Sequence, residues 1–366
     1  MALTKVDTSM VESSGAFGRR NIIINGDYSI YQRAQQATGL GSGATYPTAD
    51  RWVLNGDTAG RLTMTAGTAD APAESNVTVS CKLDCTTADT SIGADEYCLL
   101  QQRIEGQNLQ HVKKGTSGAR QLTASFWVKG NASATYALEL YDADNTRQVS
   151  KSFSVTSSWS KVELTFPADT TGAFDNDANV SIYFQIWLHG GSSFTSGTLS
   201  ETWTSVTNAN RAAGISSFFS STSNELYVTA IQLEVGDVAT EFEILSYPEK
   251  LALCQRYFER KQAKANTFLC IGSSFNTTAA YGIFDHQVEK RGTPSISLSG
   301  EGNGGSDWQW LTTAGSSPSG TGTTVGHTMT TWNTRLQSSG YTGLTNQNVS
   351  GFYSFGTAYI DIDAEL

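Results

Sequence analysis

The sequence is poor in charged residues, which make up 16% of its 366 positions, and in proline, which occurs 6 times. Small polar residues take their place, and glycine alone occurs 35 times. This composition is typical of β-strands that have one solvent-exposed face and are joined by many turns. Because a chain of this length exceeds what one hydrophobic core usually serves, we expect two domains.

Basic residues are also scarce, since 24 lysines and arginines stand against 34 aspartates and glutamates, for a net charge of −10. Without a basic run to neutralise phosphates, nucleic acid is not an expected partner. No apolar run approaches about 18 residues, so we expect no membrane-spanning segment. The first residues lack the apolar stretch of a signal peptide, so we expect the chain to be made in a cytoplasm and not exported by that route.

Residues that bind transition metals are few. The 5 cysteines are odd in number, which together with a cytoplasmic origin favours buried free thiols over disulfides. The histidines, His111, His189, His286 and His327, are scattered without the spacing of a zinc site. We therefore expect no cofactor.

The chain also lacks the short motifs of common enzymes, among them G-x-S-x-G, H-E-x-x-H and the phosphate-binding G-x-x-x-x-G-K-[ST]. With 34 carboxylates, a catalytic acid pair of a glycosidase cannot be identified from the sequence. We therefore expect a protein that is not an enzyme. A depolymerase of host polysaccharide is the alternative.

The sequence alternates between apolar and polar residues over much of its length. From about residue 60 to residue 245, apolar side chains recur at every second position, as in Leu122, Ala124, Phe126 and Val128. Many short alternating stretches separated by turn residues predict an all-β protein whose N-terminal domain is an antiparallel jelly-roll β-sandwich. No internal repeat of fixed period is present, which disfavours a β-helix or a propeller.

Residues 246–261 predict the one connecting helix. Ser246 and Glu249 have the spacing of a capping box, and Pro248 stands in the first turn, where a missing N–H costs nothing. A wide apolar stripe predicts packing between the two domains or between chains of an oligomer, with a plain linker helix as the alternative. The residues of the stripe are Leu251, Leu253, Cys254, Tyr257 and Phe258.

The remaining residues, 262–366, predict a smaller C-terminal β-domain. We expect its strands near residues 268–271, 279–288, 295–298 and 352–366. The Gly/Ser/Thr-rich region 299–350 is expected to form long loops that carry aromatic side chains. The predicted organisation is an N-terminal arm (1–20), a jelly-roll domain (21–245), the connecting helix (246–261) and the C-terminal β-domain (262–366).

Five motifs follow one another along the chain. They are residues 20–33 (RNIIINGD and QR) with 48–52 (TADRW), 122–130 (LTASFWVKG), 159–162 (WSKV) with 166–167 (FP), 231–243 (IQLEVGDVATEFE) and 251–258 (LALCQRYF). Together they resemble phage tail-fibre and virion structural proteins whose first domain is a jelly roll similar to carbohydrate-binding modules. Residues 1–6 (MALTKV) also resemble the start of phage tail fibres and tailspikes.

The resemblance implies a virion protein, a tail fibre or receptor-binding protein that is often a homotrimer. Its partners would be other tail or capsid proteins, through the arm of residues 1–20, and a host surface polysaccharide, through the C-terminal tip. A structural virion protein, such as a capsid decoration or tail-assembly protein without a glycan ligand, is the alternative. The resemblance also implies a structural calcium ion near the first strand, to which Asp27 could contribute.

Aromatic faces stack on the apolar faces of pyranose rings, and two sets of residues are candidate glycan platforms. The first set is Trp308, Trp310, Trp332 and Tyr341, which lie outside the motifs, as host-specific residues should. The second set is Trp127, Tyr183, Gln185 and Trp187, together with Tyr141, on the non-core face of the large domain. For both sets the alternative is packing, in the core of the small domain or against a covering element or subunit.

Overall fold

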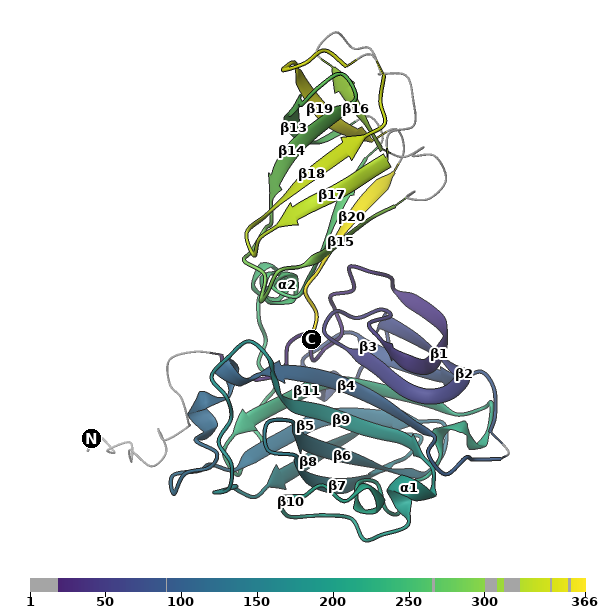
Figure 1. The fold of residues 1–366 in the computed structure, drawn as a ribbon. Coiled ribbons are helices and arrows are strands. Elements are labelled where there is room, and N and C mark those ends of the chain that lie inside the picture. Colours follow the sequence, from purple (N-terminus) through teal and green to yellow (C-terminus); the bar gives the residue numbers. More distant parts are fainter. Residues whose placement is uncertain are drawn as a thin grey trace, which may run out of the picture. The chain divides into compact units, whose positions relative to one another are not determined.

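The computed structural model of the protein describes residues 19–89, 91–264, 267–299, 308–312, 323–342, 344–354 and 357–366. The predicted all-β class is confirmed, because strands form nearly all of the regular structure (Figure 1). The chain divides into a first unit, up to Lys250 with Leu366 added, and a second unit, Leu251–Glu365. The predicted arm lies almost wholly outside the described residues.

One antiparallel sheet of 11 strands makes up the first unit. Its strands are β1 (Gln36–Thr45), β2 (Val53–Thr68), β3 (Ser80–Cys85), β4 (Tyr97–Glu105), β5 (Leu122–Gly130), β6 (Ala134–Asp142), β7 (Arg147–Val155), β8 (Ser160–Phe166), β9 (Val180–Gly190), β10 (Thr204–Ser205) and β11 (Glu225–Val235). A short helix, α1 (Ser192–Thr195), and 3₁₀ turns lie in the connections, among them η5 (Asn208–Asn210) and η6 (Phe218–Ser220).

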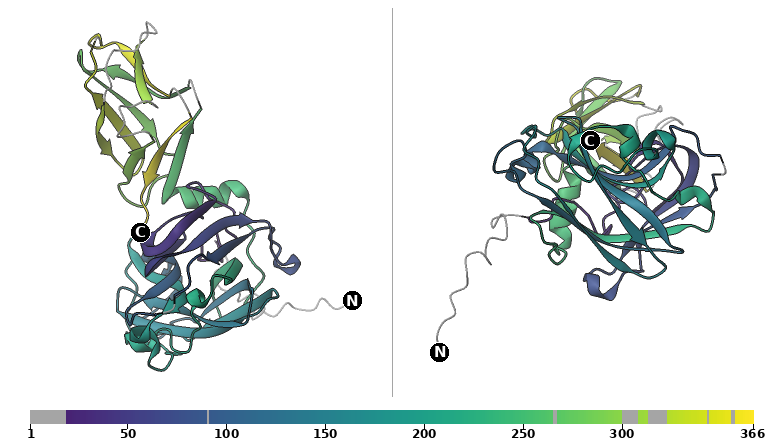
Figure 2. Two further views of the ribbon diagram at one scale, coloured as in Figure 1. Left: turned by 90° about the vertical axis from the view of Figure 1, so that its right-hand side faces the viewer. Right: turned by 90° about the horizontal axis from the view of Figure 1, so that it is seen from below.

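The sheet curls into a sandwich because strand β2 serves both layers. The start of β2 pairs with β4 and its end pairs with β3, so the order is β10-β7-β6-β9-β4-β2-β3-β11-β5-β8. The two layers enclose one large apolar core. Within it Phe126 of β5 meets Phe153 of β7 edge-on, with 5.0 Å between ring centroids. The predicted jelly-roll sandwich is therefore confirmed, and Figure 2 shows its curled strands from two further sides.

The segment before β1 closes the sandwich without being a strand. No strand begins before Gln36 among the described residues. Instead the Asn21 side chain accepts from the Leu233 amide at 3.0 Å and donates to the Ile231 carbonyl at 3.0 Å. At Gly26 an added Cβ would lie 2.0 Å from the carbonyl oxygen of Ile231, so the close approach requires glycine.

Two motifs far apart in the sequence meet at this closure. The backbone amides of Arg20 and Asn21 donate to the two carboxylate oxygens of Glu243 at 2.9 and 3.1 Å. The Arg20 guanidinium also donates to the Glu241 carbonyl at 2.6 Å. The residues of the first and fourth motifs are thus structural, since they join the beginning of the sandwich to its last strand.

The connecting helix is shorter than predicted. Helix α2 spans Tyr247–Gln255, and the Glu249 carboxylate accepts from the Ser246 amide at 3.0 Å, as the capping box requires. The prediction that it continues to residue 261 is wrong, because Phe258 begins a strand. Tyr257 and Phe258 are buried outside the helix, and so only part of the predicted apolar stripe exists.

The second unit contains two antiparallel sheets. Its strands are β12 (Phe258–Ala263), β13 (Thr267–Ser274), β14 (Ala279–Asp285), β15 (Ser295–Leu298), β16 (Trp308–Thr312), β17 (Thr323–Met329), β18 (Asn333–Ser339), β19 (Val349–Ser354) and β20 (Ala358–Asp363). The orders are β12-β20-β15 and β16-β19-β13-β14-β18-β17. The prediction of long loops over residues 299–350 is wrong, because β16, β17 and β18 lie there.

All five cysteines are buried and none forms a disulfide with another described residue. Among the described residues, no helix is both long and apolar enough to cross a membrane.

Candidate functional site

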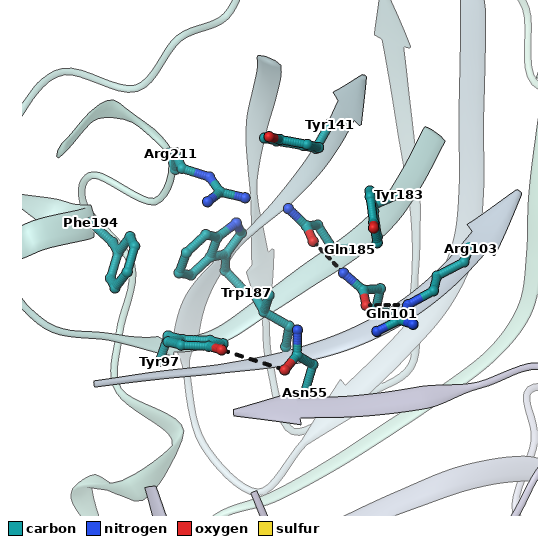
Figure 3. Close-up of a pocket in the computed structure, with 11 residues that line it drawn as sticks. Asn55, Tyr97, Gln101, Arg103, Tyr141, Tyr183, Gln185, Trp187, Phe194 and Arg211 are labelled. Carbon is teal, nitrogen blue, oxygen red and sulfur yellow. Dashed lines mark hydrogen bonds between the residues drawn. The ribbon is translucent and has the colours of Figure 1, made fainter. Parts of the chain in front are cut away.

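The outer face of the layer that contains β4, β9 and β6 carries a groove of about 340 Å³ (Figure 3). This volume lies within the range of ligand pockets, roughly 300–1,000 Å³. Successive strand residues point to opposite faces, so every second residue of β4 and β9 reaches the groove. The lining residues are Asn55, Tyr97, Leu99, Gln101, Arg103, Tyr141, Tyr183, Gln185, Trp187, Phe194 and Arg211.

The strand register places these residues in rows across the sheet. In the middle row Gln101, Gln185 and Glu139 stand directly opposite one another on β4, β9 and β6. The next row along the strands is Arg103, Tyr183 and Tyr141. On the other side of the middle row Leu99 pairs with Trp187, which pairs with Ala137. The groove is therefore built by pairing of strands that are far apart in the sequence.

A chain of hydrogen bonds runs along the middle row. The Arg103 Nε donates to Gln101 at 3.2 Å, Gln101 donates to Gln185 at 2.7 Å, and Gln185 donates to the Glu139 carboxylate at 2.5 Å. Glu139 is fully buried and also accepts from the Trp187 indole at 2.7 Å. Because each amide has both a donor and an acceptor partner, the orientations of the two glutamines are fixed.

One end of the groove is closed by the connection after β9. Arg211 donates to both oxygens of Glu139, at 2.9 and 3.2 Å, and its guanidinium lies 5.0 Å from the Tyr141 ring and 5.1 Å from the Trp187 ring. Phe194 of α1 packs on Trp187 with 5.2 Å between centroids. Only 1% of Trp187 is therefore exposed. Trp187 is thus covered by another element, which is the alternative that we stated for this platform.

Three tyrosines keep part of their rings accessible. Tyr141 and Tyr183 meet edge-on at 5.7 Å, and both are half-buried. Tyr97 lies further along β4, where its hydroxyl approaches Asn55 Oδ1 at 3.5 Å (Figure 3). Rings at separate points of a groove can contact successive units of a chain ligand.

Polar hydrogens remain available along the same groove. Gln101 uses one of its two amide hydrogens on Gln185, and Asn55 donates its amide hydrogens to no acceptor among the described residues. Arg211 binds Glu139 through Nε and Nη2, which leaves Nη1. Fixed amides and guanidinium groups beside aromatic rings can bind vicinal hydroxyl groups.

The described lining of the groove consists of aromatic and aliphatic side chains, amides and guanidinium groups. Among the described lining residues there is no carboxylate, histidine, serine or cysteine. The nearest carboxylate, Glu139, is buried beneath them and its oxygens accept from Arg211, Trp187 and Gln185. A general acid or base must be able to reach the proton that it transfers, and Glu139 is not placed to do so.

The structure places most of the first predicted platform in a core. Trp308, Trp310 and Tyr341 are buried in the second unit, and Trp308 stacks on Phe352 with 4.9 Å between centroids. A buried ring offers no face to a sugar, so the packing alternative holds for these three residues. Trp332 is 58% exposed, and it is the one member of this set with an accessible ring.

The second predicted platform is divided between two faces. Tyr183, Gln185 and Trp187 line the groove, as does Tyr141. Trp127 lies on β5 in the other layer, where it is half-buried beside Lys161 and lines a separate hollow with Glu241.

Asp27, which was predicted to contribute to a calcium site, already has a cationic partner. Its carboxylate forms an ion pair with Lys250 and accepts from the Ser29 hydroxyl at 3.1 Å. An ammonium group at this carboxylate already supplies the positive charge that a calcium ion would bring.

Sequence reasoning missed the residues of β4 and of the covering connection. Tyr97, Leu99, Gln101 and Arg103 alternate with the core residues Cys98 and Leu100, and this period of two was the available signal. No pattern indicates Phe194 or Arg211, because they reach the groove from an irregular connection.

Comparisons with known proteins match this chain only at the level of structure. No protein-family model and no curated protein matches the sequence. Among solved structures, a family 61 carbohydrate-binding module in complex with β-1,4-galactotriose is similar at 11% identity, over 59% of this chain and 99% of that one, with a TM-score of 0.29. The CBM22-1 xylan-binding domain of Paenibacillus barcinonensis Xyn10C is similar at 11% identity, over 61% and 100%, with a TM-score of 0.28.

The enzymatically active domain of tailspike protein 4 of bacteriophage CBA120 is similar at 13% identity, with a TM-score of 0.26. The match covers 59% of this chain and 21% of the tailspike chain. Because all three TM-scores lie below 0.5, what these proteins bind or cleave is not transferred to this chain.

Proposed function

We propose that the first unit binds a polysaccharide chain in the groove on β4, β9 and β6, and that it does so without catalysis. The observation that carries the proposal is the middle row, in which Gln101 and Gln185 are fixed by hydrogen bonds beside the half-buried side chains of Tyr97, Tyr141 and Tyr183. Rings supply stacking faces and oriented amides supply hydrogen bonds, which are the two kinds of contact that a sugar chain requires.

The test is binding of the full chain to a glycan array and to a panel of neutral and acidic polysaccharides in affinity electrophoresis. A single shallow site is expected to bind weakly, with a Kd near ~1 mM. Tyr183→Ala should weaken binding by about 1–2 kcal/mol, which is about 5- to 30-fold. Tyr183→Phe should bind nearly as the native chain does, because it keeps the ring.

A matched control is Tyr31→Ala, which removes an exposed tyrosine of the same unit that does not line the groove. If Tyr31→Ala and Tyr183→Ala weakened binding equally, the ligand would not lie in the groove. If no glycan were bound at all, a structural role without a glycan ligand would replace this proposal.

We further propose that the protein is part of a phage particle, as a fibre or receptor-binding protein that assembles as a homotrimer. The support is the order of the five motifs, together with the resemblance of residues 1–6 (MALTKV) to tail fibres and tailspikes. Under this proposal the groove attaches the particle to a host surface polysaccharide, and several copies would raise a weak affinity by avidity, about 10²–10⁴-fold.

Native mass and adsorption test this second proposal separately from glycan binding. A stable trimer, and particles that lose adsorption to host cells when Tyr183 is replaced, are the expected results. A monomer that binds glycan would contradict the fibre assignment and leave the groove assignment intact. Release of reducing ends from host polysaccharide would instead establish a depolymerase.

A further inference from the structure

Three side chains with metal-binding atoms converge at the edge of the first unit, away from the groove lining. They are Asp89 and Glu96, from the connection between β3 and β4, and His189, from the end of β9. One ligand atom from each lies within 4.8 Å of the other two, and His189 Nε2 is 3.7 Å from Glu96 Oε2. Residues about 100 positions apart in the sequence are thus held together by the fold.

His189 presents an unpartnered nitrogen to this cluster. The residue is 0% exposed, and its Nδ1 lies 2.7 Å from Ser217 Oγ. Its Nε2 is buried and has no hydrogen-bond partner. A buried nitrogen without a hydrogen-bond partner is destabilising, so such an atom needs an explanation. A second ring nitrogen held by a hydroxyl is also the arrangement that orients a metal-binding imidazole.

The two carboxylates are also held by backbone amides. The Asp89 Oδ1 accepts from the Ser91 amide at 3.0 Å, whereas its buried Oδ2 has no hydrogen-bond partner. The Glu96 Oε2 accepts from the Gly93 amide at 3.1 Å, and the Glu96 side chain is 27% exposed. The cluster therefore has anchored ligands and a route from solvent through Glu96.

The three groups of the cluster have shifted pKa values. Burial lowers the pKa of His189. Burial and the neighbouring Asp89 raise the pKa of Glu96, whereas the Ser91 amide and other partners lower the pKa of Asp89.

One cation already stands beside the cluster. Arg61 Nη2 lies 3.5 Å from Asp89 Oδ2, and its Nη1 donates to the Ala88 carbonyl at 2.8 Å. Arg61 is too far from Oδ2 for a good hydrogen bond, and its positive charge lowers the pKa of both Asp89 and Glu96. The positive charge of Arg61 repels a metal ion and therefore weakens metal binding at this cluster.

We propose that Asp89, Glu96 and His189 form a binding site for one divalent transition-metal ion, with zinc the best fit to this ligand set. Zinc takes imidazole nitrogen and carboxylate oxygen at roughly 2.0–2.2 Å, in tetrahedral geometry with water in the remaining position. Donors in that geometry lie about 3.4 Å apart, so the observed separations need side-chain movements of about 1 Å. Calcium and magnesium, which prefer oxygen ligands, fit less well.

A metal ion at this position would brace one edge of the groove. Glu96 directly precedes the groove residue Tyr97, and its carbonyl accepts from the Gly191 amide at 2.8 Å. The neighbouring Asp95 accepts from Ser193 of α1 at 2.5 Å. The site would therefore join the start of β4 to the end of β9 and to the connection that carries Phe194.

The test uses the full chain, stripped of metal with a chelator and titrated with ZnCl₂ by calorimetry. We expect one zinc ion per chain, a rise in the unfolding temperature with zinc concentration, and no comparable effect of CaCl₂. Substitution with Co²⁺ should give the visible absorption of a four-coordinate site. His189→Ala should weaken zinc binding at least about 10-fold, whereas His111→Ala, which removes an exposed histidine elsewhere, should not.

Glu96→Gln is the second variant, because this partly exposed side chain can be changed without opening the core. It should also weaken zinc binding, and Arg61→Gln should strengthen it by removing the opposing charge. Absence of zinc binding to the native chain, or binding that is unchanged in both His189→Ala and Glu96→Gln, overturns the proposal. In that case a proton shared among the three residues, visible by NMR titration of His189, accounts for the cluster.

Discussion

Two pairs of aromatic residues in this protein, each on one face of a sheet, differ in exposure. In the groove of the first unit, Tyr141 and Tyr183 lie on neighbouring strands and keep part of their rings accessible. In the second unit Trp308 and Trp310 lie two positions apart on β16 and are both buried against Phe352. Spacing of two places side chains on one face of a strand, but it does not say what covers that face.

The two pairs differ in exposure because different residues pack against them. The face of β16 that carries the tryptophans belongs to the core of the second unit, together with Tyr341 and Leu336. The outer face of β9 is covered at Trp187 by Phe194 and Arg211, whereas Tyr183, further along the strand, is half-buried. Removing a ring should therefore reduce stability in the second unit and affinity in the first.

The largest effect is expected from Trp310→Ala. Trp310 is 0% exposed, and removal of a buried tryptophan costs about 3–5 kcal/mol in the free energy of unfolding. Hydrogen exchange of β19 should report the loss within the second unit, whereas glycan binding by the first unit should be unchanged. Equal loss of protection in the groove strands would show that the two units do not unfold independently.

Glu139→Gln should have the next largest effect, and it tests the buried carboxylate that holds Gln185 and Arg211 in place. The substitution keeps the size of the side chain but removes the charge that binds Arg211, which costs about 1.5–3 kcal/mol in stability. Because Gln185 and Arg211 lose their fixed partner, glycan affinity should fall as well. Calorimetric unfolding and affinity electrophoresis measure the two losses, and a fall in affinity without a fall in stability would contradict this account.

Gln101→Ala should have a smaller effect on stability than Glu139→Gln, and it should also weaken binding. Gln101 donates one amide hydrogen to Gln185, and under the proposed function its second amide hydrogen binds the ligand. We expect affinity for the glycan to fall by about 1 kcal/mol, which is about 5-fold. The unfolding temperature should change little in comparison with Glu139→Gln, and affinity equal to that of the native chain would remove the middle row from the binding site.

Trp332→Ala should have the smallest effect. This tryptophan is largely exposed, so its loss should change the free energy of unfolding by no more than about 0.5 kcal/mol. If glycan binding were lost in this variant and kept in Tyr183→Ala, the second unit would contain the glycan site. The prediction that placed a platform there would then hold for Trp332 alone.

The motifs and the groove occupy different parts of the sequence, and this explains why the site was hard to predict. Arg20, Asn21 and Glu243 belong to motifs, and they bind one another where the sandwich closes. Of the lining residues of the groove, none lies in a motif. The motifs therefore indicate the scaffold. The groove residues depend on which strands become neighbours.

Local patterns were reliable where a single segment decides its own structure. The capping box at Ser246 and Glu249 forms, and alternation predicted most strands of the sandwich. The predicted end of the helix was wrong because Phe258 suits a helical stripe and also a strand, and pairing of Phe258 with Asp363 decides for the strand. The Gly/Ser/Thr-rich composition of residues 299–350 indicated loops, but strand pairing places β16, β17 and β18 there.

By itself, the sequence determined that this protein is all-β, with a jelly-roll sandwich first, because the period of two and the frequent turns are local properties of the chain. Tertiary structure alone decided which aromatic rings face solvent and which polar groups meet. Gln101, Gln185 and Glu139 form one row, and Asp89, Glu96 and His189 one cluster, only because strand register joins residues about 40 to 100 positions apart. Register depends on long-range pairing, which no short stretch of sequence specifies.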